Sequence, residues 1–348
     1  MRPFALGCWS MCSGVCVRSP GKEESPTRHP RMRPASPDSF RALVLVGPTA
    51  TGKSLVAHHI AQLVGMDILS ADSMAVYRGM DVGTDKPTPE MRREVRYFGI
   101  DLVEPVEPFS VGRFYDYCRG LKAGGMVRSG KLLVVGGSGL YVKALTHGMD
   151  PTPATPEEIR GEVEQIFRGG GIPALIAELH QRAPQMLSEV GDLRNPRRLM
   201  RALELAWLEV GRRMSWRTRT DPPLVVGLKC DRSLMYKGIE ERIDRMLECG
   251  LISEVAALKE RYGRLSNTAR QAIGYGEVWQ YLDGRLTLDQ VRHRMIRRTR
   301  ELAKRQMTWF RHQERVRWVE IEREEKGPAV ERVLALWQEH EEETYLAI

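Results

Sequence analysis

A parallel α/β fold is predicted by three features of the sequence. Short apolar runs lie at residues 42–46, 131–135 and 225–228, and the first two lead directly into glycine-containing turns. Helically patterned, charged segments separate the runs, so strands and helices alternate along the chain. A run that is apolar throughout is typical of a strand buried on both faces. The alternation therefore predicts a doubly wound parallel sheet with helices on both sides.

The first strand is followed by a phosphate-binding loop. Its sequence is Gly47-Pro48-Thr49-Ala50-Thr51-Gly52-Lys53-Ser54, a complete G-x-x-x-x-G-K-[ST] pattern, and an apolar-patterned helix follows at 55–61. In such a loop, backbone N–H groups and the positive helix end attract phosphate oxygens, Lys53 contacts them, and the Ser54 hydroxyl binds Mg²⁺. The predicted core is therefore P-loop NTPase-like and holds a di- or triphosphate. The loop alone leaves open whether phosphate is transferred, hydrolysed or released.

The second strand, at 66–70, delivers Asp72 beside this loop. Carboxyl ends of parallel strands are where α/β sheets bind their ligands, which makes Asp72 a candidate site residue. The segment 72–87 mixes carboxylate, hydroxyl, aromatic and basic groups, and a solvated loop is its alternative interpretation. The strand at 131–135 ends in Gly136-Gly137-Ser138-Gly139, without the acidic residue that ATP hydrolysis requires. The usual hydrolytic apparatus is therefore not evident.

Changes in composition divide the chain into five parts. A proline-rich boundary at 151–156 precedes charged, helically patterned sequence that is interrupted by glycines near 168–171. The predicted parts are a disordered leader at 1–40, the first part of the α/β core at 41–150, a helical insertion at 151–216, the second part of the core with basic helices at 217–318, and a C-terminal tail at 319–348.

Composition indicates a soluble, cytoplasmic globular enzyme. The 348 residues are 42% hydrophobic and carry a formal net charge of +8, which is compatible with a polyanionic partner but does not establish one. No stretch approaches the roughly 18 to 20 apolar residues that span a bilayer. The six cysteines show no C-x-x-C spacing and indicate reduced thiols. For the leader, a signal peptide, a metal site at Cys8, Cys12 and Cys16, and a true start at Met32 are the alternatives.

A basic helix is predicted at 295–311. Lys304, Arg305 and Arg311 can grip a phosphate backbone, and Trp309 offers a stacking surface. The alternative is a solvated basic helix whose aromatic residues lie in the core. The basic segment 194–201 is equally ambiguous by itself.

In combination, these segments closely resemble the tRNA dimethylallyltransferases, also called tRNA isopentenyltransferases. The resemblance extends over about residues 42–316, and the order and spacing of the matching pieces are specific although each piece is common. The pieces are the loop at 47–54, Ser70-Ala71-Asp72-Ser73-Met74-Ala75-Val76-Tyr77-Arg78-Gly79-Met80-Asp81-Val82-Gly83-Thr84, Gly136-Gly137-Ser138-Gly139-Leu140-Tyr141, Arg201-Ala202-Leu203-Glu204, Ile273-Gly274-Tyr275, and Ala303-Lys304-Arg305-Gln306-Met307-Thr308-Trp309-Phe310-Arg311.

The resemblance implies transfer of a dimethylallyl group from its diphosphate to N6 of adenine 37 in tRNAs that read codons beginning with U. The loop would then hold a leaving diphosphate, with Mg²⁺ at Ser54 neutralising its charge. Asp72 would be the general base for the adenine amine, with Thr49 and Lys53 as the other catalytic residues. The adenine would leave its stack to enter the pocket.

The resemblance also implies the partners, namely dimethylallyl diphosphate and the anticodon stem-loop of tRNA, with no membrane and with a monomer as the default state. The helical insertion would contact the anticodon stem-loop. The expected tRNA-binding residues are Asp72, Ser73, Met74, Ala75, Ser138, Arg160, Arg197, Arg198, Leu199, Met200, Arg201, Gln271, Gly274, Tyr275, Lys304, Arg305, Gln306, Trp309 and Arg311.

The chain departs from the family pattern at three places. Gly238 replaces an arginine whose partner Arg242 is retained, Gly276 replaces a basic residue, and Tyr97-Phe98-Gly99 replaces His-His-Leu. If the missing arginine neutralises diphosphate, turnover falls unless Lys237 or Arg113 substitutes. Three alternatives therefore stay open: prenylation of free AMP, ADP or ATP, a small-molecule P-loop kinase, and a tRNA-binding protein with weakened catalysis. Which tRNAs are modified is not encoded in a readable way.

Overall fold

The fold is organised around a six-stranded sheet whose strand order is β3-β2-β4-β1-β5-β6. The computed structural model describes residues 41–127, 131–149, 153, 155–209, 223–322, 326–340 and 346–348, so the predicted leader lies outside the described residues. The strands are β1 (Arg41–Val46), β2 (Asp67–Ser70), β3 (Tyr97–Phe98), β4 (Lys131–Gly136), β5 (Val225–Lys229) and β6 (Val316–Glu320). Every pairing between them is parallel. The predicted parallel α/β core is confirmed.

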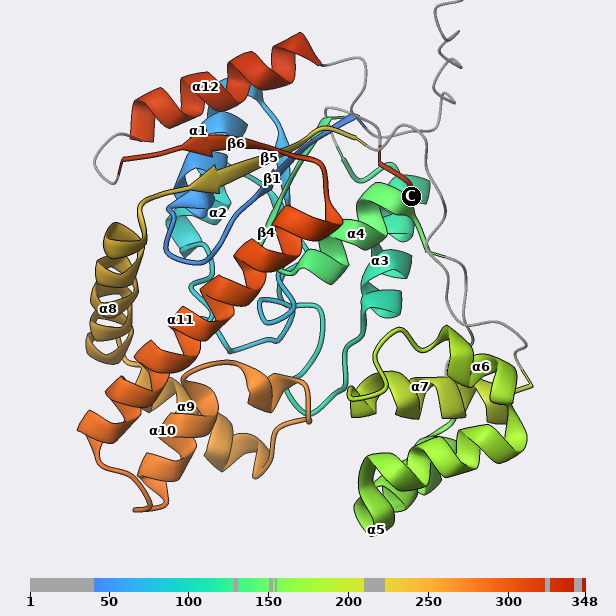
Figure 1. Cartoon of the computed structure of the whole chain (residues 1–348). Helices are drawn as coiled ribbons and strands as arrows, with labels where there is room; N and C mark the ends of the chain where they lie inside the picture. The colour runs from blue at the N-terminus through green and yellow to red at the C-terminus, as the bar shows by residue number, and fades with distance from the viewer. Residues whose placement is uncertain are drawn as a thin grey trace, which may run out of the picture. The chain divides into compact units, whose positions relative to one another are not determined.

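Both faces of the sheet are covered by helices (Figure 1). In the central strand β1, Ala42, Val44 and Val46 face one hydrophobic core, and Leu43 and Leu45 face the other. The first core includes residues of α3 (Val111–Ala123), α4 (Gly139–His147), α8 (Arg232–Glu248), α9 (Leu251–Tyr262), α10 (Tyr275–Leu282) and α11 (Leu288–Gln313). The second includes residues of α1 (Lys53–Val64) and α12 (Lys326–Glu339). Strand residues alternate in direction, which is why one apolar run supplies both cores.

Two of the six strands were not predicted. The strand β3 has only two residues, which is too short for a periodic signal. The strand β6 has the sequence Val316-Arg317-Trp318-Val319-Glu320 and pairs in parallel with β5. The sequence pattern alone assigns these residues partly to the end of a basic helical region and partly to an acidic tail. The strand β6 forms an edge, where charged side chains are tolerated because one side of the strand is open to solvent.

Residues 157–207 form three helices with a hydrophobic core of their own. These helices are α5 (Glu157–Arg182), α6 (Pro184–Glu189) and α7 (Pro196–Trp207). Val163, Leu175, Leu199 and Leu203 are buried against one another between α5 and α7. The predicted interruption near 168–171 is a kink inside α5, where Gly171 has a φ of 62° that suits glycine.

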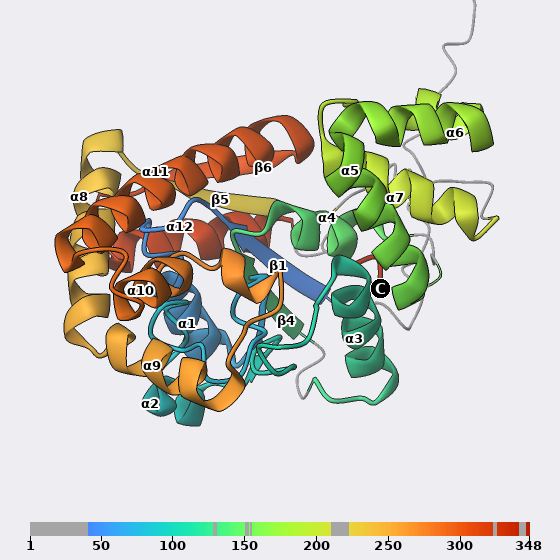
Figure 2. The same cartoon turned by 90° about the horizontal axis from the view of Figure 1, so that it is seen from below.

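The long helix α11 ends beside the sheet and carries the basic segment. Its first residue is set by Thr287 and Gln290, which form a capping box. Figure 2, seen from below, shows α11 lying across the sheet with α8 and α10 beside it. A short helix, α2 (Pro89–Glu94), and one 3₁₀ turn, η1 (Ala269–Gln271), complete the core. Within the described ranges, no helix has the length and apolar character needed to cross a membrane.

Candidate active site

The phosphate-binding loop joins β1 to α1 and is shaped by residues with positive φ. Gly47 has a φ of 150°, and a Cβ there would lie 2.6 Å from the carbonyl oxygen of Leu228 in the neighbouring strand β5. Gly52 is the N-cap of α1 with a φ of 76°. Only glycine fits at position 47, because a side chain there would clash with the neighbouring strand. Position 52 strongly favours glycine because its φ is positive. The loop therefore presents its backbone at the positive end of α1, as an anion site requires.

Lys53 lies half-buried at the first turn of α1 and is tuned by its surroundings. Burial, reinforced by the positive charge of Arg242, lowers the pKa of Lys53 to about 8. The negative charges of Asp72 and Asp85 act in the opposite direction. Protein groups therefore surround the Lys53 ammonium, although the residue keeps some solvent exposure. The nearby negative charges do not fully compensate for the burial of its positive charge. A bound diphosphate would supply that negative charge.

Two helices from the second half of the chain reach the loop at Thr49. The backbone N–H of Thr49 donates to Gln306 Oε1 of α11 at 2.9 Å, and Arg242 of α8 donates to the Thr49 hydroxyl at 2.7 Å. Arg242 also lies 3.5 Å from Asp85. Thr49 is thus held between α8 and α11, and its hydrogen bond with Arg242 places a second cation next to the loop.

Asp72 lies at the carboxyl edge of the sheet next to the same loop. It follows β2, whose Ser70 pairs in register with Val135 of β4, and β4 in turn is the neighbour of β1. The carboxylate accepts a hydrogen bond from the Met74 backbone N–H at 2.8 Å, which fixes one oxygen within its own turn. Its charge is near enough to raise the pKa of Lys53. Asp72 therefore lies close enough to Lys53 for their charges to interact, and its role as a site residue stays a prediction.

Ser138 contacts the residue after Asp72, and Trp309 lies against the residue after Ser138. The Ser138 hydroxyl accepts from the Ser73 backbone N–H at 3.0 Å and lies 3.2 Å from the Ser73 hydroxyl. A Cβ on Gly139 would lie 2.1 Å from the Trp309 ring. Within the described residues, the buried Trp309 Nε1 has no hydrogen-bond partner. Trp309 thus packs closely against Gly139 at the start of α4 and is half-buried against the first hydrophobic core.

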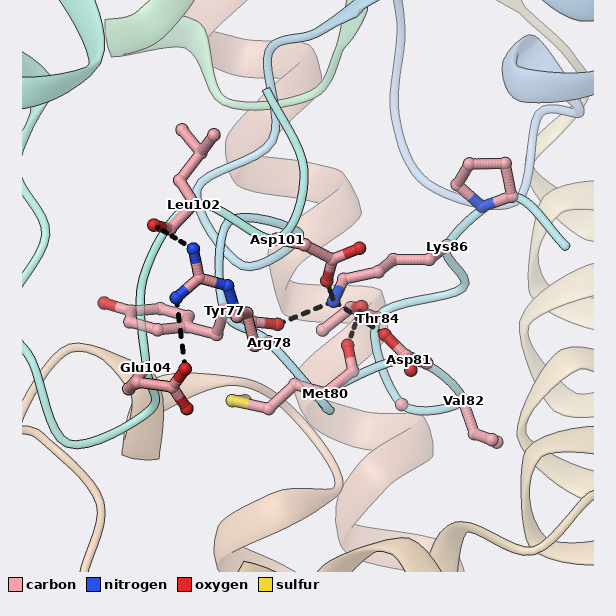
Figure 3. A network of polar contacts seen from close by, with 12 residues as sticks. Tyr77, Arg78, Met80, Asp81, Val82, Thr84, Lys86, Asp101, Leu102 and Glu104 are labelled. Carbon is pink, nitrogen blue, oxygen red and sulfur yellow. Dashed lines mark hydrogen bonds and ion pairs between the residues drawn. The ribbon is translucent and has the colours of Figure 1, made fainter. Parts of the chain in front are cut away.

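The segment after Asp72 is an ordered structure, not a solvated loop (Figure 3). The ammonium of Lys86 is almost completely buried and donates to the Tyr77 carbonyl oxygen at 2.6 Å, to Asp81 at 2.7 Å and to Asp101 at 2.6 Å. Arg78 donates to the carbonyl oxygen of Leu102. These bonds tie the segment to the chain near Asp101 and so limit how far Asp72 can move.

A second anchor for this segment comes from α9, and no local pattern of residues indicates it. The carboxylate of Glu254 accepts from the backbone N–H groups of Asp81 at 2.9 Å and Val82 at 2.8 Å, and from the Tyr275 hydroxyl at 2.6 Å. Burial and the charge of Glu254 raise the pKa of the Tyr275 hydroxyl well above its usual value. The sequence of an amphipathic helix does not indicate whether one of its glutamates is solvated or accepts hydrogen bonds from a loop about 170 residues away.

The expected tRNA-binding residues fall into exposed and buried groups. The side chains of Arg160, Arg197, Arg198, Gln271, Lys304, Arg305 and Arg311 are exposed. Asp72, Ser73, Met74, Ser138, Met200, Arg201, Gln306 and Trp309 are half-buried, whereas Ala75, Leu199, Gly274 and Tyr275 are buried. Leu199 packs in the core of the three-helix unit, and Tyr275 is bound to Glu254. Direct side-chain contact with RNA is therefore not expected of Leu199 or Tyr275; both support neighbouring residues.

A metal ion would have few protein ligands here. No group of three or more His, Cys, Asp or Glu in the described part of the chain is arranged to hold one. Ser54 is exposed at the start of α1, next to Lys53. One hydroxyl beside a phosphate site fits Mg²⁺, which keeps several waters and takes its other ligands from phosphate.

Two family models match the chain. The model described as IPP transferase matches residues 75–313, and the one described as isopentenyl transferase matches residues 40–101. Among solved structures, the chain is similar to the tRNA isopentenylpyrophosphate transferase of Bacillus halodurans, with a TM-score of 0.64, 34% identity, and coverage of 88% of this chain and 98% of that one. A eukaryotic dimethylallyltransferase acting on tRNA shares the fold, with a TM-score of 0.67 at 21% identity, over 86% of this chain and 79% of that one.

Curated relatives give the same result over nearly their whole length. The tRNA dimethylallyltransferase of Carboxydothermus hydrogenoformans is 37% identical over 306 residues, which is 85% of this chain and 97% of the relative. That of Thermus thermophilus is 41% identical over 278 residues, covering 78% and 89%. With a family model covering more than half of its residues and relatives well above 30% identity, the chain belongs to the IPP transferase family.

Proposed function

We propose that the protein transfers a dimethylallyl group from dimethylallyl diphosphate to N6 of adenine 37 in tRNAs that read codons beginning with U. The observation that carries the proposal is the shared site of Asp72 and Lys53, in which a base and a diphosphate grip lie together at the carboxyl edge of the sheet. The names of the relatives support the reaction type. A cytoplasmic, monomeric enzyme is part of the same proposal.

The phosphate loop stabilises the leaving group. In the transfer, the C–O bond between the allylic carbon and the diphosphate breaks, and negative charge accumulates on the departing diphosphate oxygen. Lys53 and Arg242, together with the loop N–H groups at the positive end of α1, are fixed where this charge develops. Because these groups are oriented before reaction, they stabilise the leaving diphosphate without reorganisation.

Mg²⁺ would be held by the Ser54 hydroxyl. When bound, it supplies further positive charge to the diphosphate. The exposure of Ser54 leaves room for the waters that this ion retains.

Asp72 takes the proton that the acceptor loses. The adenine N6 forms a new bond to the allylic carbon, and one N6 proton moves to the carboxylate of Asp72. The Met74 N–H occupies Oδ1 of Asp72, so Oδ2 is the oxygen available to the amine. Ser138 contacts Ser73 beside Asp72, and Trp309, against Gly139, is the aromatic ring on which a base that has left its stack would lie.

The glycine at 238 bears on the strength of catalysis. A Cβ on Gly238 would lie 3.5 Å from the Ala50 carbonyl oxygen, so the position faces the phosphate loop. Arg242, one turn later, reaches Thr49 directly. The site thus keeps a cation from α8, which favours an active enzyme over a tRNA-binding protein with weakened catalysis.

A transfer assay tests the proposal. The protein is given labelled dimethylallyl diphosphate with bulk tRNA, with free AMP, or without acceptor, and labelled ATP is tested separately as a phosphate donor. We expect label on tRNA, mapped to adenine 37 by mass spectrometry of digested tRNA.

The variant Asp72→Asn, which preserves the size of the side chain, should lose about 10²- to 10⁴-fold in rate and keep tRNA binding. The exposed Asp116→Asn on α3 is the matched control. Label on AMP alone, or phosphate transfer from ATP, would overturn the proposal.

A further inference from the structure

The cations of α11 are of two kinds. Some are fixed within the protein: Arg292 binds Asp244 through two nitrogens at 2.6 and 2.9 Å, and Arg298 binds Glu277. Others are exposed and make no ion pair with any described residue, namely Arg294, Arg297, Lys304, Arg305 and Arg311. The first kind stabilises the fold, and the second kind keeps its charge for a partner.

Three of these free cations, Arg297, Lys304 and Arg311, form a line. They are seven residues apart, so each lies two helical turns, or about 10 Å, from the next. An α-helix drifts only about 20° per seven residues, so their side chains leave the same face of α11. The line is therefore about 20 Å long from Arg297 to Arg311. Lys304 and Arg311 were already expected to contact tRNA, whereas Arg297 was not.

A groove accompanies the first half of this line. It has a volume of about 510 Å³, lies between α8 and α11, and is lined by Tyr236, Arg297, Arg300 and Lys304 among others. The guanidinium of Arg300 lies 4.6 Å from the centre of the Tyr236 ring and binds Glu240. Its Nε is buried without a hydrogen-bond partner among the described residues. Arg294, Arg297 and Lys304 line the groove without an ion pair to a described residue, whereas Glu301 adds one negative charge, so the unpaired charge of the groove is positive on balance.

The Tyr236 ring is not free to stack on a base. Arg232 also lies over it, 5.0 Å from the ring centre, and its Nε donates to the Tyr236 hydroxyl at 3.0 Å. Cations already occupy the aromatic surface. The chemistry of the groove therefore matches a phosphate backbone and not a base.

The groove is also separate from the transfer site. On α8, Gly238 and Arg242 face the phosphate loop, at Ala50 and Thr49. Glu240 and Asp244 face α11 instead. Because residues two apart on a helix point in nearly opposite directions, the α11 side of α8 does not open onto the diphosphate position.

We propose that Arg297 extends the expected tRNA contacts of Lys304 and Arg311, so that the cation line binds the sugar–phosphate backbone of the tRNA from Arg297 to Arg311. The inference rests on the proposed function for the identity of the RNA. A line of about 20 Å matches a chain of phosphates better than a single diphosphate, which would occupy only one of the three positions. The interaction adds affinity without reading sequence.

Binding of tRNA as a function of salt concentration tests the inference. Fluorescence anisotropy with labelled tRNA compares the parent, Arg297→Gln and Arg297→Glu. Each lost phosphate contact should reduce the slope of log affinity against log salt by about 0.7 to 0.9, with several-fold weaker binding for Arg297→Gln and a larger loss for Arg297→Glu. Arg332→Gln, on α12 against the opposite face of the sheet, is the control with the same charge change and should bind tRNA as the parent does.

Two further readouts separate the possible failures. At saturating tRNA the Arg297 variants should keep the parent kcat, because Arg297 does not touch the transfer site, and their melting temperatures should equal that of the parent. If both variants bind tRNA with the parent affinity and salt slope, the inference is overturned. If Arg297→Gln instead loses binding of inorganic diphosphate while tRNA binding is unchanged, the groove is a small-anion site and the inference is again wrong. A parent that binds tRNA but transfers nothing would contradict the proposed function and leave the cation line to be judged by binding alone.

Discussion

Gln306 and Thr49 lie 257 residues apart in sequence and are joined by a hydrogen bond, in which the side-chain oxygen of Gln306 accepts from the backbone N–H of Thr49 at 2.9 Å. One donor of the phosphate loop is thereby occupied by α11. The same side chain lies against Gly137, where a Cβ would approach its nitrogen to 2.2 Å. The basic helix α11 and the loop at 47–54 are therefore joined directly by a hydrogen bond.

Replacing Gln306 by glutamate should weaken diphosphate binding. A carboxylate at this position would accept the same N–H and bring negative charge into an anion site. We expect KM for dimethylallyl diphosphate to rise about tenfold or more, corresponding to at least about 1.4 kcal/mol. Steady-state kinetics at saturating tRNA measures it. Gln306→Ala, which frees the N–H without adding charge, is the control, and equal KM values for the two variants would contradict the electrostatic explanation.

The pKa of Lys53 predicts how diphosphate affinity depends on pH. Because the pKa lies at about 8 in the free protein, the ammonium form that attracts diphosphate is lost as the pH rises through 8. Affinity for diphosphate should therefore be highest below pH 8 and fall between about pH 8 and 9.5. Calorimetric titration with inorganic diphosphate across this range measures it. Lys53→Met should bind more weakly at every pH and lose this part of the pH dependence; an identical profile for parent and variant would assign the titration to another group.

Adding a methyl group at Gly139 should disturb the acceptor side of the site. The new Cβ would lie 2.1 Å from the Trp309 ring, so the ring must move or α4 must shift. Overpacking of this kind costs about 1 to 3 kcal/mol, and kcat/KM for tRNA should fall more than KM for dimethylallyl diphosphate rises. Gly120→Ala within α3 is the matched control, since nothing lies within 4 Å of its Cβ, and it should be neutral or slightly stabilising. Normal tRNA kinetics for Gly139→Ala would show that Trp309 does not line the acceptor position.

Glu254→Gln should loosen the segment that carries Asp72. The carboxylate receives two backbone N–H groups and the Tyr275 hydroxyl, and an amide accepts them less strongly. We expect a loss of about 1 to 3 kcal/mol in the free energy of unfolding, measured with urea, together with reduced transfer. Tyr275→Phe, which removes only one of these hydrogen bonds, should lose less. A double variant no worse than Glu254→Gln alone would confirm that both residues act through one anchor, and additive losses would refute it.

Much of the fold was readable because its signals are local. The loop at 47–54 lies between a buried strand and a helix in sequence, and the apolar run from Leu132 to Val135 indicates a buried strand because glycines follow it directly. The kink at Gly171 followed from three consecutive glycines. In contrast, β6 was missed because its residues resemble the end of a charged helix until β5 is available to pair with it.

The neighbourhood of Asp72 and Lys53 could also be expected from sequence, because parallel strands place their carboxyl ends at one edge. The interactions that hold this site required the folded chain. Gln306 at Thr49 and Glu254 at Asp81 join segments more than 170 residues apart, and no local pattern distinguishes such a glutamine or glutamate from a solvated one. The ion pairs of α11 could not be predicted from sequence either, because its cations are similar residues in one helix. Packing of α8 and α10 against α11 pairs Arg292 and Arg298 with carboxylates and leaves Arg297 without an ion pair among the described residues. Residue types thus specified four of the six strands and the loop, because their signals are local, whereas long-range packing decided which charges pair within the fold and which stay unpaired among the described residues.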